Sequence, residues 1–123
     1  MKKFKHKLLY VEDHYAIRNS MSKILANVLF ENPIDIAENG LQGLELFKEN
    51  RYDLIISDIA MPKMNGVEMA KNIKELDVDI PIIFVSGFDK DFKNEIDTLN
   101  NSCLIPKPLN FEQLVEKIKE ISK

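Results

Sequence analysis

The sequence predicts an α/β fold, a doubly wound parallel sheet of five strands in a (βα)5 arrangement. Three observations predict it. The hydrophobic period alternates five times between short apolar runs and helical spacing, turn-forming residues fall between them, and repeats and low-complexity stretches are absent. Because crossovers between parallel strands are right-handed, we expect helices on both faces of an open sheet.

Five short apolar runs have the length and the Ile/Val content of buried parallel strands. They are LLYV (8–11), IDIA (34–37), LIIS (54–57), PIIFVS (81–86) and CLIP (103–106). Each run is followed by a segment with helical spacing. The alternation therefore predicts five strands, each followed by a helix.

The predicted helices carry apolar residues three or four positions apart. Asn39–Gly40, Asn65–Gly66 and Gly87 fall at strand-to-helix junctions, where a tight turn is needed, and Asn110 is placed to cap the last helix. The five stripes are Ile17, Met21, Ile24, Leu25 and Val28; Leu41, Leu44 and Phe47; Met69, Ala70, Ile73 and Leu76; Phe92, Ile96 and Leu99; and Phe111, Leu114, Val115, Ile118 and Ile121.

Length and composition indicate one ordinary globular domain over residues 1–123, with 45% apolar and 30% charged residues. The net charge of -3 gives no basic field for nucleic acid, and no apolar run approaches the length of a membrane span. The single cysteine, Cys103, agrees with a reducing, cytoplasmic location and is expected to pack as a small apolar residue. His6 is expected to be a solvated residue at a strand edge.

Three carboxylates follow strands that should be neighbours in the sheet. Glu12 and Asp13 follow the first strand and Asp58 follows the third. The carboxyl ends of parallel strands meet at one edge, so these groups should lie close together. Two like charges about 4 Å apart repel by on the order of 4 kcal/mol at an effective dielectric near 20. A raised pKa or a bound cation relieves that repulsion, and carboxylate oxygens with open positions favour Mg²⁺.

Two further polar residues complete the rim of this predicted site. Ser86 follows the fourth strand and Lys107 follows the fifth. A metal ion, a lysine and a hydroxyl around an accessible aspartate can hold a phosphoryl group. Asp58 is therefore a candidate nucleophile that would form an aspartyl phosphate.

These residues resemble the receiver domains of two-component response regulators. The resemblance runs from LLYVEDH to IPKPLNFEQL and covers essentially the whole chain. It rests on Glu12–Asp13, AENG (37–40), SDIAMPKMNG (57–66), Ser86 and Lys107–Pro108. It implies a flavodoxin-like sheet with strand order 2-1-3-4-5.

The resemblance also implies roles for the acidic residues. Asp58 would accept a phosphoryl group from the phosphohistidine of a sensor histidine kinase or a histidine phosphotransfer protein. Asp13, Asp58 and the backbone carbonyl of Ala60 would coordinate Mg²⁺, with Glu12 contributing through water. The domain would thus be a stoichiometric phosphoprotein rather than an enzyme.

For the basic and hydroxyl residues, the resemblance implies that Lys107 pairs with phosphoryl oxygens and that Ser86 moves to bind one of them. The Lys107–Pro108 bond would be cis. The surface of the fourth helix, fifth strand and fifth helix would then bind a downstream effector protein or domain, or form a phosphorylation-dependent homodimer.

The chain departs from the family pattern at three positions. Leu104 stands where the family usually has a Tyr or Phe that turns inward on activation, which leaves the usual switching mechanism in question. Ala60 and Phe88 occupy positions that tune the lifetime of the phosphoryl group, and neither side chain can hydrogen-bond an attacking water. We therefore expect slow autodephosphorylation. Phe88, Phe92 and Leu104 are expected either to form an exposed partner patch or to pack in the core.

Three other functions remain to be compared with this interpretation. A degenerate receiver would serve only as a docking or dimerisation module. A Mg²⁺-dependent phosphatase with an aspartate nucleophile typically carries a second Asp where this chain has Ala60. A flavin or nucleotide binder needs a glycine-rich or hydroxyl-rich phosphate loop after the first strand, where this chain has the acidic pair Glu12–Asp13.

Overall fold

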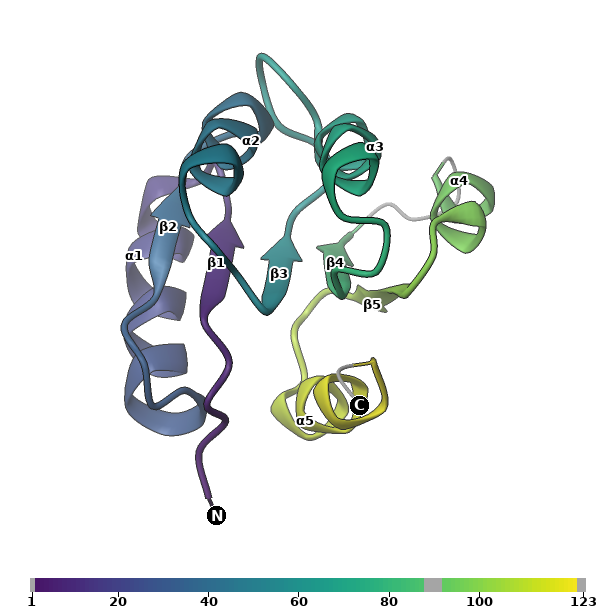
Figure 1. Cartoon of the computed structure of the whole chain (residues 1–123). Helices are drawn as coiled ribbons and strands as arrows, with labels where there is room; N and C mark the ends of the chain where they lie inside the picture. Colours follow the sequence, from purple (N-terminus) through teal and green to yellow (C-terminus); the bar gives the residue numbers. More distant parts are fainter. Residues whose placement is uncertain (1, 88–91, 122–123) are drawn as a thin grey trace.

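Within residues 2–87 and 92–121, which the computed structural model describes, five parallel strands form one sheet in the order β2-β1-β3-β4-β5 (Figure 1). The predicted fold class and strand order are confirmed. The strands are β1 (Leu8–Val11), β2 (Asp35–Ala37), β3 (Leu54–Ser57), β4 (Ile82–Ser86) and β5 (Ser102–Pro106). The helices are α1 (Tyr15–Ile24), which continues as the π-helix η1 (Leu25–Leu29), α2 (Gly40–Glu49), α3 (Gly66–Leu76), α4 (Lys93–Thr98) and α5 (Phe111–Ile121).

Two hydrophobic clusters cover the two faces of the sheet. Successive side chains of a strand point to opposite faces, so Leu9 and Ile55 enter one cluster while Leu8 and Ile56 enter the other. The first cluster receives buried residues from α2, α3 and α4, and the second receives them from η1 and α5. Figure 1 shows α2 and α3 on the side of the sheet opposite α5. Helices therefore cover both faces, as the sequence predicts.

The strand register brings the predicted site residues together. Val11 pairs with Ser57, so Glu12 and Asp58 leave neighbouring strands at the same level, and the Asp58 amide donates to the Val11 carbonyl at 3.0 Å. On the other side of β4, the Lys107 amide donates to the Ser86 carbonyl at 3.0 Å. The carboxyl edge of the sheet thus positions all three charged groups without any long loop.

The first helix differs most from the sequence expectation. None of the ten residues of α1, all of them described, is buried, and Ile17 and Val28 of the predicted stripe are 40% and 53% exposed. Of the predicted stripe, Leu25 is buried as expected, together with Leu29, which the stripe did not include. Both belong to the π-helical segment, where Phe30 N–H donates to the Leu25 carbonyl at 2.9 Å. Ile17 and Met21 border a cavity of about 460 Å³ between α1 and α5, which leaves this face of α1 without close packing against α5.

Asparagine caps and close-packed glycines begin the helices where the sequence predicts them. The side chains of Asn39, Asn65 and Asn110 accept from the backbone amides of the residues three positions later. A Cβ added to Gly66 would overlap the Asp58 carbonyl oxygen, so only glycine allows α3 to start this close to β3. The start of α3 therefore abuts the backbone of the candidate nucleophile.

Replacing Asn110 with Ala is expected to destabilise the protein by about 1 kcal/mol, because α5 loses its capping acceptor. The side chain of Asn110 accepts from Gln113 N–H at 3.0 Å, and α5 buries Leu114 and Ile118 against the sheet. Urea unfolding measures the change, with Asn110→Ser as a control that keeps a capping oxygen. Equal stability of the Ala and Ser variants would contradict a capping role.

Candidate functional site

An acidic cluster lies at the carboxyl edge of β1 and β3. One carboxylate oxygen from each of Glu12, Asp13 and Asp58 can be chosen so that all lie within 4.8 Å of one another. Glu12 is only 3% exposed, Asp58 is half-buried and Asp13 is exposed. The structure therefore brings together the three carboxylates that the sequence predicts, in a graded environment from interior to solvent.

Lys107 provides the counter-charge to this cluster. Its Nζ lies 3.2 Å from Asp58 Oδ2 and 3.6 Å from Glu12 Oε1. Partial burial alone would lower the pKa of Lys107, but the carboxylates of Asp58 and Glu12 outweigh burial and raise it. Lys107 therefore remains protonated and bridges the two strand ends. The Lys107–Pro108 peptide bond is cis, as the resemblance implies.

Burial raises the pKa of Glu12 from 4.5 to about 7. The negative charge of Asp58 adds to the rise, while the hydrogen bond that His14 N–H donates to Glu12 Oε2 at 3.1 Å and the ammonium of Lys107 oppose it. One lysine thus offsets only part of the repulsion in the cluster. A cation that binds these oxygens would displace the proton from Glu12.

The remaining oxygen of Asp58 is held by its own chain. Ile59 N–H donates to Asp58 Oδ1 at 2.7 Å, while the Ser57 hydroxyl donates to the Asp58 carbonyl at 2.7 Å. Oδ1 is therefore fixed by the backbone and Oδ2 faces Lys107. This arrangement orients the carboxylate at the mouth of the site.

The other predicted residues of the rim lie where the sheet places them. Ser86 ends β4 and is 4% exposed, and Ala60 is exposed two residues beyond Asp58. Leu104 and Phe92 are half-buried and pack against the core on the α2–α3–α4 face, which favours packing over an exposed patch for these two. Phe88 lies outside the described residues.

The cavity between α1 and α5 opens beside the acidic cluster. Glu12, Asp58 and Lys107 line one end of its roughly 460 Å³, and most of the remaining lining is apolar. Tyr10 also lines this cavity. Burial raises the pKa of Tyr10, and the negative charges of Glu12 and Asp58 raise it further.

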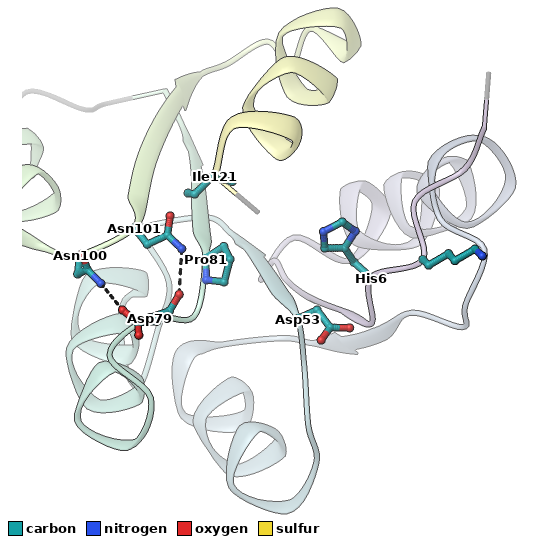
Figure 2. Close-up of a pocket in the computed structure, with 8 residues that line it drawn as sticks. His6, Asp53, Asp79, Pro81, Asn100, Asn101 and Ile121 are labelled. Carbon is teal, nitrogen blue, oxygen red and sulfur yellow. Dashed lines mark hydrogen bonds between the residues drawn. The ribbon is translucent and has the colours of Figure 1, made fainter. Parts of the chain in front are cut away.

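A larger cavity, about 840 Å³, lies at the opposite edge of the sheet, near the amino ends of the strands. His6, Asp53 and Asp79 line it (Figure 2). The Asn100 side chain donates to Asp79 Oδ1 at 2.8 Å, and the Asn101 side chain donates to the Asp79 carbonyl at 2.9 Å. His6 is half-buried rather than solvated, and among the described residues its buried Nδ1 has no hydrogen-bond partner. The predicted site residues all lie at the other edge, so cavity size and the predicted site indicate opposite ends of the sheet.

The donor set fits Mg²⁺ by its chemistry. Three carboxylate oxygens are hard ligands, they approach one another closely, and Asp13 is open to solvent for the waters that Mg²⁺ retains. Transition metals would favour imidazole or thiolate ligands. His14, the nearest imidazole in sequence, instead accepts from Ile17 N–H through Nδ1 at 3.5 Å and caps α1.

A family profile described as the response regulator receiver domain matches residues 8–119. The chain belongs to this family. The match covers all five strands and nearly all of α5, so the receiver domain accounts for the whole sheet and the acidic edge. The chain is thus a receiver domain of the two-component response regulator type.

Curated relatives of this receiver domain differ widely in length. It is 33% identical to the chemotaxis protein CheY of Bacillus subtilis over 117 residues, covering 94% of this chain and 96% of that protein. It is 34% identical to the CpxR homolog of Haemophilus influenzae, a transcriptional regulatory protein, covering 94% of this chain but 49% of that protein. The chain therefore spans nearly all of some relatives and about half of others.

Solved structures show the same fold. The response regulator TrrA of Thermotoga maritima, in complex with Mg²⁺ and BeF, is similar with a TM-score of 0.81 and 31% identity, over 96% of this chain and 99% of that one. A CheY-like receiver of Methanospirillum hungatei gives a TM-score of 0.79 at 28% identity, over 95% and 93%. Among residues 2–87 and 92–121 of this receiver domain, no helix has the length and apolar character needed to cross a bilayer.

Sequence reasoning missed one residue that contacts this site. Arg18 donates from Nη1 to the carbonyl oxygens of Glu12 at 2.9 Å and Asp13 at 3.3 Å. From sequence alone, an arginine on a polar helix face is expected to be exposed to solvent. The only sequence signal is its place five residues after Asp13, in the first turn of the helix that follows the acidic pair.

Proposed function

We propose that this receiver domain accepts a phosphoryl group on Asp58 from a phosphohistidine in a Mg²⁺-dependent reaction. The observation that carries the proposal is the meeting of Glu12, Asp13 and Asp58 with Lys107, whose Nζ is 3.2 Å from Asp58. This arrangement offers a nucleophile, a set of metal ligands and a fixed cation within one small edge of the sheet. Positioning and electrostatic stabilisation are the main requirements of phosphoryl transfer.

Each residue has a distinct part in the proposed transfer. A carboxylate oxygen of Asp58 forms a bond to phosphorus as the bond between phosphorus and the histidine nitrogen breaks. The Lys107 ammonium pairs with a phosphoryl oxygen, and the Ser86 hydroxyl binds another. Asp13, Asp58 and the Ala60 carbonyl would hold Mg²⁺, with Glu12 acting through water, and the bound ion would neutralise charge on the phosphoryl oxygens.

The proposal is tested by incubating the protein with a small phosphodonor such as acetyl phosphate, with Mg²⁺ or with EDTA. Intact-mass spectrometry and peptide mapping are expected to find a Mg²⁺-dependent adduct on Asp58. Continuous phosphate release without an adduct would indicate an aspartate-nucleophile phosphatase instead. Neither adduct nor release would indicate a degenerate receiver that serves only for docking.

Hydrolysis of the adduct is expected to be slow, because the Ala60 side chain cannot hydrogen-bond an attacking water. Phe88, the other residue expected to govern the lifetime, is likewise unable to do so through its side chain. The decay of phospho-Asp58 is followed by intact mass after the donor is removed in Mg²⁺ buffer. A half-life of seconds would contradict this expectation.

Sensor histidine kinases or histidine phosphotransfer proteins are the proposed donors, and an effector protein or domain is the proposed target of the α4-β5-α5 surface. In support, a solved complex joins CheX and CheY of Borrelia burgdorferi, and that CheY is 25% identical to this chain with a TM-score of 0.81. We also propose that residues 1–123 form a single domain and that its location is cytoplasmic. The domain would further form a homodimer when it is phosphorylated. The output of any longer regulator is a separate question, since relatives such as the CpxR homolog are about twice the length of this chain.

A further inference from the structure

Arg18 ties the start of α1 to the loop that carries two of the three acidic residues. Its backbone amide donates to the His14 carbonyl at 2.9 Å, which places the residue within the helix. Its guanidinium turns back along the helix, and Nη1 donates to the carbonyls of both Glu12 and Asp13. The two hydrogen bonds hold consecutive peptide groups against one rigid planar group.

The backbone at this point lies beyond the parallel ladder. The last residue of β1 to pair with β3 is Val11, and the Glu12 amide still donates to the Ala37 carbonyl of β2 at 3.0 Å. The carbonyls of Glu12 and Asp13 then leave the sheet. Each of these carbonyls accepts a hydrogen bond from Arg18, which therefore holds the backbone just beyond the last hydrogen bonds of the sheet.

The stacking of Arg18 limits how its guanidinium can turn. The guanidinium carbon lies 5.5 Å from the centroid of the Tyr15 ring, a cation–π distance. The Tyr15 ring and the two carbonyls therefore all contact the same guanidinium. The positive charge of Arg18 also acts on Tyr10, where it opposes the rise in pKa that burial and the nearby carboxylates cause.

We infer that Arg18 is a positioning residue for the divalent cation site, holding the Glu12–Asp13 backbone so that both carboxylates converge with Asp58. Like charges in the cluster push this loop away from β3, and the two hydrogen bonds from Arg18 resist that displacement. Arg18 does not touch the cation, and its own positive charge would disfavour one. Its positioning effect and its charge effect on cation affinity therefore have opposite signs, which makes them separable. The inference rests on the proposed function.

The test compares three variants by calorimetric titration with Mg²⁺, well below the unfolding temperature. Arg18→Met is expected to weaken Mg²⁺ binding about 10-fold, the scale on which residues that orient metal ligands act. Arg18→Lys keeps the charge but lacks the planar fork, so it is expected to weaken binding nearly as much. Arg51→Met is the matched control, because Arg51 is the other arginine of the chain and precedes the amino end of β3.

Three results would overturn the inference. Tighter Mg²⁺ binding in Arg18→Met would show that charge repulsion dominates over positioning. Wild-type affinity in Arg18→Met, together with a lower melting temperature, would show a structural role only. Wild-type affinity in Arg18→Lys would show that charge rather than the fork is what matters. Failure of the wild-type protein to bind Mg²⁺ or to form the Asp58 adduct would instead overturn the proposed function, so the two failures are distinguishable.

Discussion

Replacing Asp58 with Asn is expected to abolish phosphoryl incorporation and to stabilise the metal-free protein. The amide is a poor nucleophile, so the Mg²⁺-dependent adduct disappears. Removal of one negative charge relieves the repulsion that Asp58 exerts on Glu12 and Asp13. Lys107 then remains paired with Glu12, which it already approaches to 3.6 Å.

The expected gain in the free energy of unfolding is about 1 kcal/mol, because solvent at Asp13 and Asp58 screens part of the repulsion. Urea unfolding in EDTA measures it, and the same protein should bind Mg²⁺ more weakly than wild type. Asp97→Asn is the control, since Asp97 is an exposed aspartate on α4. A less stable Asp58→Asn protein in EDTA would refute the repulsion argument, and an undiminished adduct would place the nucleophile elsewhere.

The strands and the site could be predicted because both follow from simple rules. Apolar runs set β1 and β3 with the bounds that the structure gives, and the topology of an open parallel sheet carries polar strand ends to one edge. Lys107 is 49 residues from Asp58 in sequence, yet its contact with that carboxylate follows from the order of β3, β4 and β5. The predicted group of charged residues needed no knowledge of side-chain packing.

What could not be predicted depends on how elements pack after they form. The predicted stripe has correct helical spacing, but Ile17 stays exposed beside a cavity between α1 and α5, and Val28 stays exposed while its η1 neighbours Leu25 and Leu29 are buried. Spacing says which residues share a helix face and nothing about how closely that face approaches the sheet. The contact of Arg18 with the acidic loop could not be predicted for the same reason, because it depends on which carbonyls the side chain reaches.

Raising the pH from 5 to 7.5 without Mg²⁺ is expected to destabilise the protein through Glu12. The folded-state pKa is about 7 and the ordinary value is 4.5, so the folded protein binds more protons between these two values. The free energy of unfolding therefore decreases as the pH rises through that window. A shift of this size corresponds to about 3 kcal/mol, reached only when Glu12 is fully ionised.

Unfolding free energies at several pH values, with EDTA and with saturating Mg²⁺, measure this effect. If Mg²⁺ is held as proposed, it competes with the proton on Glu12, so its affinity should increase with pH and the loss of stability should shrink. Glu12→Gln removes the titrating group while nearly preserving side-chain size, and the difference between it and wild type cancels the contributions of groups that both proteins share. A pH profile in EDTA that is identical for Glu12→Gln and wild type would show that Glu12 carries no raised pKa. In that case burial and the charge of Asp58 would together be offset by Lys107 and the His14 amide, and Glu12 would give a cation no proton to displace.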